Sequence, residues 1–204
     1  SGDASAGIWE RGIPNQTTFE SNISNPGEDA NTDCGSEAFV TGNQAQGSAG
    51  SDDVDDGITR LTSPIMDLSN NSNPVIQFEY WFFNGGGSSQ VNDSYLVKMD
   101  NGTDVITMGS LGQTDNQWTE QSFALSSLIS LTSTMQMIVE VGDTDPGHLV
   151  EGGLDKFRVH EASGVNLSEN TTVSVYPNPT NNFVNIEVSE KGLVQFFDLA
   201  GKLV

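Results

Sequence analysis

The 204-residue sequence is poor in basic side chains, with 7 Lys and Arg against 28 Asp and Glu, and its formal net charge is -21. Nucleic acids and anionic membrane surfaces are bound through Lys and Arg, so this balance argues against both as partners. No apolar run approaches the roughly 20 residues that a membrane-spanning helix needs. A strongly negative surface instead favours solubility and the binding of divalent cations.

Cysteine and histidine are also scarce, because Cys34, His148 and His160 are the only ones. A single Cys excludes an intrachain disulfide, and its acidic neighbours disfavour a reactive thiolate. Two distant His argue against a zinc site and against a Ser/His/Asp arrangement. No spacing pairs two glutamates as a glycosidase requires, so we expect no enzyme.

Gly, Ser, Thr, Asn and Val dominate, as in β-sandwiches with many turns. The clearest strand covers residues 75–83, where Ile76, Phe78, Tyr80 and Phe82 share one face and predict a core. Asn101-Gly102 predicts a hairpin turn between strands at 93–99 and 104–108. Further strands are expected at 37–41, 58–63, 117–125, 135–141 and 150–160. Residues 1–161 are therefore predicted to form an all-β domain, a jelly-roll β-sandwich.

The apolar pattern stops after this domain and then restarts. Residues 162–172 are polar and lack periodicity, so we interpret them as a linker. Residues 173–204 alternate again and predict the start of a second, small β-sandwich. Pro177 and Pro179 fix an extended entry that cannot be a central strand.

Four carboxylates lie within residues 52–56, and Arg60 alone cannot neutralise them. A hard cation with oxygen ligands, calcium above all, would relieve their repulsion. Val54 and Ser63 occupy the third and twelfth positions, which excludes an EF-hand loop. If Phe157 and Val159 face the core, Asp155 shares that face and needs a partner. The predicted calcium ligands are Asp53, Asp55, Asp56 and Asp155, with Asp143, Asp145 and Glu151 in reserve. The alternative is a solvated acidic turn.

Tryptophans offer candidate ligand contacts. Trp81 is predicted on the face opposite the core, and Trp81 and Trp118 are the candidates for stacking on a sugar. The alternative is that Trp9, Trp81 and Trp118 all pack within the sandwich or support its rim.

The C-terminal segments 175–180 (VYPNPT), 183–186 (FVNI) and 197–204 (FDLAGKLV) resemble the type A C-terminal sorting domain of the type IX secretion system. The chain covers the N-terminal part of that domain. The residues that carry the sorting motif are Tyr176, Pro177, Asn178, Pro179, Gly201 and Lys202. The resemblance implies contact with the type IX secretion machinery, export across the outer membrane of a Gram-negative Bacteroidota cell, and a secreted or cell-surface location.

Segments 9–14 (WERGIP), 40–43 (VTGN), 55–64 (DDGITRLTSP) and 150–157 (VEGGLDKF) resemble the MAM-like jelly-roll modules of secreted Bacteroidota peptidases. The resemblance implies a non-catalytic module that binds calcium. It also implies a domain without its usual first strand, as in a piece of a longer polypeptide. MAM disulfides have no counterpart here.

The expected function is that of a calcium-stabilised accessory module that binds an extracellular protein or glycan and accompanies a peptidase or another hydrolase. Two alternatives stay open. One is a structural adhesin or self-assembling β-protein, and the other is a glycan-binding module of a carbohydrate-active enzyme.

Overall fold

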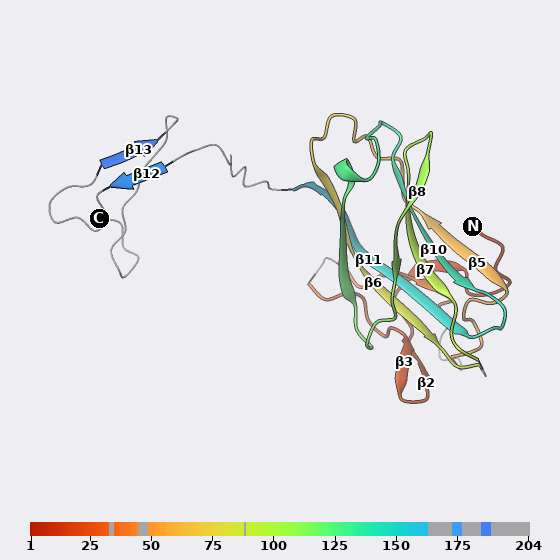
Figure 1. The fold of residues 1–204 in the computed structure, drawn as a ribbon. Coiled ribbons are helices and arrows are strands. Elements are labelled where there is room, and N and C mark those ends of the chain that lie inside the picture. Colours follow the sequence, from red (N-terminus) through yellow and green to blue (C-terminus); the bar gives the residue numbers. More distant parts are fainter. Residues whose placement is uncertain (33–34, 45–48, 88, 163–172, 177–184, 189–204) are drawn as a thin grey trace. The chain divides into compact units, whose positions relative to one another are not determined.

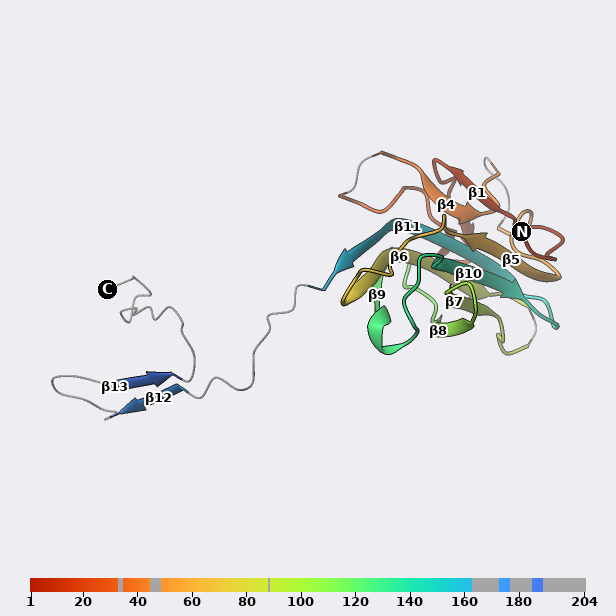
Figure 2. The same ribbon diagram turned by 90° about the horizontal axis from the view of Figure 1, so that it is seen from above.

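The computed structural model describes all residues except 33–34, 45–48, 88, 163–172, 177–184 and 189–204. The chain divides into two compact units, Ser1–Ala162 and Ser163–Val204. The first unit is a β-sandwich of jelly-roll type, which confirms the predicted fold class (Figures 1 and 2). Among the described residues, no helix has the length and apolar character to span a membrane.

Two antiparallel sheets form the sandwich. The five-stranded sheet has the order β1 (Trp9–Gly12), β4 (Ala38–Thr41), β11 (Leu149–Glu161), β6 (Pro74–Gly85) and β9 (Thr119–Ala124). The four-stranded sheet has the order β5 (Gly57–Thr62), β10 (Gln136–Asp143), β7 (Ser94–Asp100) and β8 (Val105–Leu111). A separate hairpin pairs β2 (Thr17–Phe19) with β3 (Asn22–Asn25), and a short 3-10 turn, η1, covers Leu125–Ser127.

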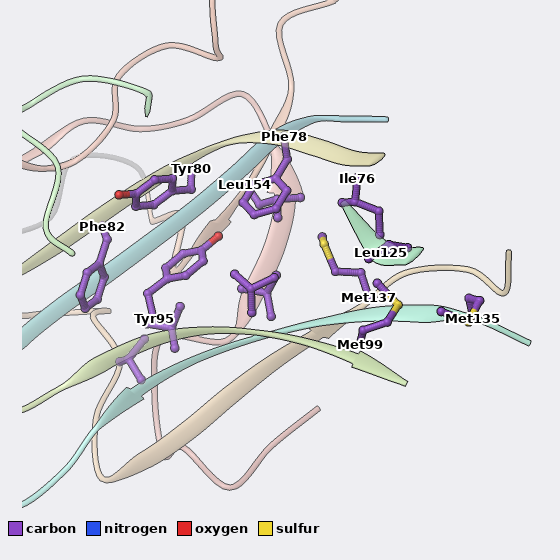
Figure 3. Close-up of a cluster of buried hydrophobic side chains, with 14 of the residues drawn as sticks. Ile76, Phe78, Tyr80, Phe82, Tyr95, Met99, Leu125, Met135, Met137 and Leu154 are labelled. Carbon is purple, nitrogen blue, oxygen red and sulfur yellow. The ribbon is translucent and has the colours of Figure 1, made fainter. Parts of the chain in front are cut away.

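Strand β6 supplies one wall of the core. Ile76, Phe78, Tyr80 and Phe82 are buried, as their alternation predicts. Their side chains point between the sheets toward Tyr95, Met99 and Met137 (Figure 3). Each fully buried apolar side chain of this size contributes about 1.5–3 kcal/mol to folding.

The opposite face of β6 is also covered near its C-terminal end. Trp81 and Phe83 are each 3% exposed. Phe19, in the β2–β3 hairpin, packs against Phe83 with 6.4 Å between ring centroids. The five-stranded sheet is therefore buried on both faces here, which places segments of the N-terminal region over its outer face.

Strand β11 contains a bulge that reverses the alternation. Asp155 pairs with Glu79 and Arg158 pairs with Gln77, so β11 holds one more residue than β6 between these pairs. Lys156 absorbs the extra length with a φ of 51°. Leu154 and Phe157 both pack toward the core, whereas Asp155 lies on the outer face. The prediction that Asp155 shares the core face of Phe157 was therefore wrong.

The second unit contains β12 (Val173–Tyr176), which pairs antiparallel with β13 (Asn185–Val188). Tyr176 ends β12. The other sorting-motif residues lie outside the described residues, as does most of the predicted linker.

Candidate functional site

Two adjoining cavities form a groove on the outer face of the five-stranded sheet. Their volumes are about 620 and 630 Å³. Thr32, Glu79 and Lys156 line both cavities and mark where they meet. Volumes of this size are typical of small-ligand sites. We call the two cavities together the outer groove.

Three of the seven Lys and Arg of the chain line the first cavity of the outer groove, namely Arg11, Lys156 and Arg158. Arg11 Nη1 lies 2.5 Å from Glu37 Oε2, and Lys156 Nζ lies 2.6 Å from Glu79 Oε1. Arg158 donates from Nε and Nη2 to Gln77 Oε1 at 2.9 and 2.7 Å. The wall therefore presents charged donors beside acceptors without a large net charge.

Trp118 is the half-buried aromatic residue of the second cavity. Its indole N–H donates to Glu28 O at 2.9 Å, and its ring lies edge-on to Trp81, 6.0 Å between centroids. A Cβ at Gly153 would lie 2.8 Å from Trp118 Cη2, so the indole needs a glycine on β11 beneath it. Trp118 therefore has a fixed position and an exposed part.

The other two tryptophans have structural roles. Trp81 lines the same cavity on the face that the sequence predicted, but it is 3% exposed and its indole N–H donates to Ser24 O at 2.8 Å. Trp9 packs edge-on against Tyr95, 6.5 Å between centroids. Trp81 thus supports the wall beneath Trp118.

Hydrogen bonds from the sheet hold the segment 24–32 over its outer face. Trp81 and Trp118 bind its carbonyl groups, and Asp155 Oδ2 accepts from Ala30 N at 2.9 Å. Lys156 Nζ donates to Asn31 O. Asp155 therefore positions the loop that borders the outer groove.

A group of carboxylates lies where the loop before β5 meets the start of β11. Val54 N donates to Val150 O at 2.9 Å, which brings Asp53 beside Glu151. Asp53 is 4% exposed and Glu151 is 2% exposed. Glu151 Oε2 accepts from Thr41 Oγ1 at 2.7 Å. We call Asp53, Asp55, Asp56 and Glu151 the acidic cluster.

Burial is the main cause of the raised pKa values in the acidic cluster, and repulsion between its carboxylates adds to it. Burial raises the pKa of Asp53 to about 7, with a further contribution from the charge of Asp55. Burial raises the pKa of Glu151 well above its usual value; the Thr41 hydroxyl opposes this shift and the Asp53 charge adds to it. Burial and then the Asp56 charge raise the pKa of Asp55. A bound cation would remove the cost of ionising these groups.

Three of the four predicted calcium ligands, Asp53, Asp55 and Asp56, lie in the loop before β5, but among the described residues they do not form a group of three with ligand atoms within 4.8 Å of one another. The structure does not bring Asp155 to them, because Asp155 lies further along β11 than Val150, roughly 16 Å at about 3.3 Å per residue. Of the reserves, Glu151 belongs to the acidic cluster. Asp143 adjoins it and Asp145 is exposed.

The oxygen donors of the acidic cluster fit a hard cation such as calcium, which is bound by carboxylate and carbonyl oxygens. Asp143 is less available as a ligand, because His148 N donates to its Oδ1 at 3.0 Å and the Asp56 N–H also binds its carboxylate. Burial and then the charge of Asp93 raise the pKa of Asp143. Oxygen or nitrogen atoms of Asp93, Asp143 and His148 lie within 4.8 Å of one another. Asp93 was not among the predicted ligands.

No curated protein matches the chain significantly. Among solved structures it is similar to TmCBM61 in complex with β-1,4-galactotriose, at 11% identity and a TM-score of 0.48, over 79% of this chain and 88% of that chain. It is also similar to the family 30 carbohydrate-binding module of a cellulosomal cellulase of Clostridium thermocellum, at 12% identity and a TM-score of 0.39. This similarity covers 79% of this chain and 95% of that chain.

The C-terminal part of the chain gives the family match. Residues 174–204 match the secretion system C-terminal sorting domain. This segment directs the protein through the type IX secretion system to the cell surface or the extracellular space.

Proposed function

We propose that the unit Ser1–Ala162 is an extracellular binding module that takes a glycan in the outer groove. The observation that carries the proposal is the half-exposed Trp118, held at a fixed position in a cavity that the Lys156–Glu79 pair also lines. An aromatic face covers the apolar face of a sugar ring, and neighbouring donors and acceptors match its hydroxyl groups.

The charge of the chain restricts the glycan further. Six acidic side chains line the two cavities together with three basic ones, and the whole chain carries -21, so a polyanion would be repelled. The basic side chains of the groove already have acceptor partners. We therefore expect a neutral, hydroxyl-rich polysaccharide rather than a sulfated or uronic acid polymer.

The second part of the proposal is a calcium ion in the acidic cluster. Asp53, Asp55, Asp56 and Glu151 would hold it, and its charge would stabilise the junction between the loop before β5 and the start of β11. The ion acts on folding and not on ligand contact, because the cluster residues do not line the outer groove.

The biological setting follows from the sorting segment. We propose that the module accompanies a hydrolase, such as a peptidase, on the same exported polypeptide of a Bacteroidota cell. A module of this kind keeps its partner enzyme near a glycan at the cell surface, and it needs no catalytic residues in the groove.

The test is affinity electrophoresis of the 204-residue chain in gels that contain one soluble polysaccharide each, neutral or anionic. At least one neutral polysaccharide should retard the chain, and Trp118→Ala should abolish the retardation. Trp118→Phe, which keeps an aromatic face, should retain part of it. Retardation by no neutral glycan, or equal retardation of the Ala variant, contradicts the proposal.

A further inference from the structure

Three side chains outside the outer groove form a chain of hydrogen bonds near the start of β11. Ser89 Oγ lies 3.1 Å from His148 Nε2, and His148 Nδ1 lies 2.9 Å from Asp93 Oδ2. The side chains of His148 and Asp93 are fully buried, whereas Ser89 is exposed. The sequence analysis argued against a Ser/His/Asp arrangement, yet the fold brings these three residues together.

The partners in this series of hydrogen bonds define where the protons lie. A carboxylate only accepts, so His148 Nδ1 carries the hydrogen toward Asp93. In a neutral imidazole Nε2 is then the acceptor, and the Ser89 hydroxyl must donate to it. A hydroxyl that donates to a His oriented by a carboxylate is the arrangement that activates a serine nucleophile.

The Asp and the His are both held by the backbone. Thr144 N donates to Asp93 Oδ1 at 2.8 Å, which leaves Oδ2 for the imidazole. His148 N donates to Asp143 Oδ1 at 3.0 Å. Asp93 therefore orients the imidazole, and the contact with Asp143 fixes the backbone that carries it.

Gly87 brings the loop that carries Ser89 onto the imidazole. Its φ is +67°, and a Cβ there would lie 2.7 Å from His148 Cδ2 and 3.2 Å from His148 Nε2. Any other residue would separate the loop from the ring. The close approach leaves no side chain of residue 87 between the imidazole and the backbone of this loop.

We propose that Ser89, His148 and Asp93 form a nucleophilic site that cleaves carboxylic esters. Ser89 Oγ would bond to the ester carbonyl carbon as its proton passes to His148 Nε2. The C–O bond to the alcohol then breaks, and the alcohol leaves with that proton. Water attacks the resulting acyl-serine, its proton returns through Nε2 to Ser89, and the carboxylic acid leaves. Water is the only co-reactant.

The surroundings restrict the substrate. Ser89 is exposed and lines neither cavity of the outer groove, so the walls of that groove would not hold the acyl group. The class of substrate that fits is a short acyl group, such as acetyl, presented on a larger alcohol. This proposal is independent of glycan binding in the outer groove.

The test uses the 204-residue chain with a fluorophosphonate probe and p-nitrophenyl acetate. The probe should form one covalent adduct, mapped by peptide mass spectrometry to Ser89. Ser89→Ala should abolish the adduct and lower ester hydrolysis by about 100-fold or more, because the acyl-serine can no longer form. The matched control is Ser127→Ala, an exposed serine of η1, which should react as the parent does.

The role of the base is tested by His148→Gln, with thermal unfolding as the check that the variant is folded. A folded variant should no longer react with the probe. If His148→Gln does not fold, the probe reactions of Asp93→Asn and Ser89→Ala are compared with that of the parent instead. The proposal is overturned if the parent forms no adduct, if Ser89→Ala keeps the adduct or the hydrolysis rate, or if folded His148→Gln reacts as fast as the parent.

Discussion

Lys156 Nζ lies 2.6 Å from Glu79 Oε1, and this pair forms the wall that the two cavities of the outer groove share. The lysine reaches that position because it occupies the bulge of β11. Its positive φ is one that residues other than glycine seldom adopt. Backbone strain that supports a particular side-chain position is common at functional sites.

The first prediction concerns this strain. Lys156→Gly and Lys156→Ala both remove the ammonium group, but only glycine adopts a φ of 51° without backbone strain. We expect the Gly variant to be more stable than the Ala variant by about 1 kcal/mol in urea unfolding. At Arg158, which follows the bulge, the order should reverse, because glycine in a regular strand is less stable than alanine. Equal stabilities of the two Lys156 variants would contradict the prediction.

The second prediction is that glycan affinity depends on the position of the Trp118 indole and not only on its presence. Gly153→Ala would place a methyl group 2.8 Å from Trp118 Cη2 and displace the indole. We expect glycan affinity to fall about tenfold, which corresponds to about 1.4 kcal/mol. Gly112→Ala, where a Cβ would contact nothing within 4 Å, should bind as the parent does. Titration calorimetry of both variants measures the difference.

The third prediction concerns calcium. The melting temperature should rise with calcium and fall with a chelator, because binding to the folded state alone adds about 2.7 kcal/mol at a hundredfold excess over Kd. Asp53→Asn should reduce the response. Asp155→Asn should leave it unchanged, because Asp155 binds Ala30 N on the outer face. A melting temperature that is indifferent to calcium would contradict a cation in the acidic cluster.

The fourth prediction concerns Glu140 on β10, whose carboxylate accepts from Arg60 and Lys98, with 2.5 Å to each cation. Burial opposes its ionisation, but these hydrogen bonds outweigh burial, and its pKa lies below the usual 4.5. A lowered folded pKa stabilises the protein above the unfolded value and loses this contribution as the pH falls through the folded value.

Glu140→Gln should therefore cost about 1–3 kcal/mol at neutral pH and progressively less below pH 4.5. Urea unfolding of parent and variant at several pH values measures the difference. The control is Glu20→Gln, at an exposed position in the β2–β3 turn. A difference that grows as the pH falls would contradict the assigned hydrogen bonds.

The sequence predicts the parts of the fold that depend on local alternation. Ile76, Phe78, Tyr80 and Phe82 identify the core face of β6, and Asn101-Gly102 identifies the hairpin between β7 and β8. Alternation also predicts the outer face of Trp81. It does not predict that Trp81 is buried, because the covering segment 24–32 is polar and has no period of its own.

The candidate sites were harder to predict from the sequence for two physical reasons. A single inserted residue in β11 shifts the alternation, so Asp155 was assigned to the wrong face on the basis of Phe157 and Val159. The contacts of His148 depend on pairing of distant strands, since His148 and Asp93 are 55 residues apart. The sequence also gives no sign that Gly87 packs against His148, because that contact is between residues 61 positions apart.

The bulge at Lys156 also has a consequence for the gain or loss of the outer groove in evolution. Asp155 and Arg158 face outward and Phe157 faces inward, and the same orientations would follow in a regular strand from which Lys156 were deleted. Loss of one codon would therefore remove the ammonium group at the centre of the groove while every later residue of β11 kept its partner. A relative without this residue would keep the sandwich and bind a different ligand.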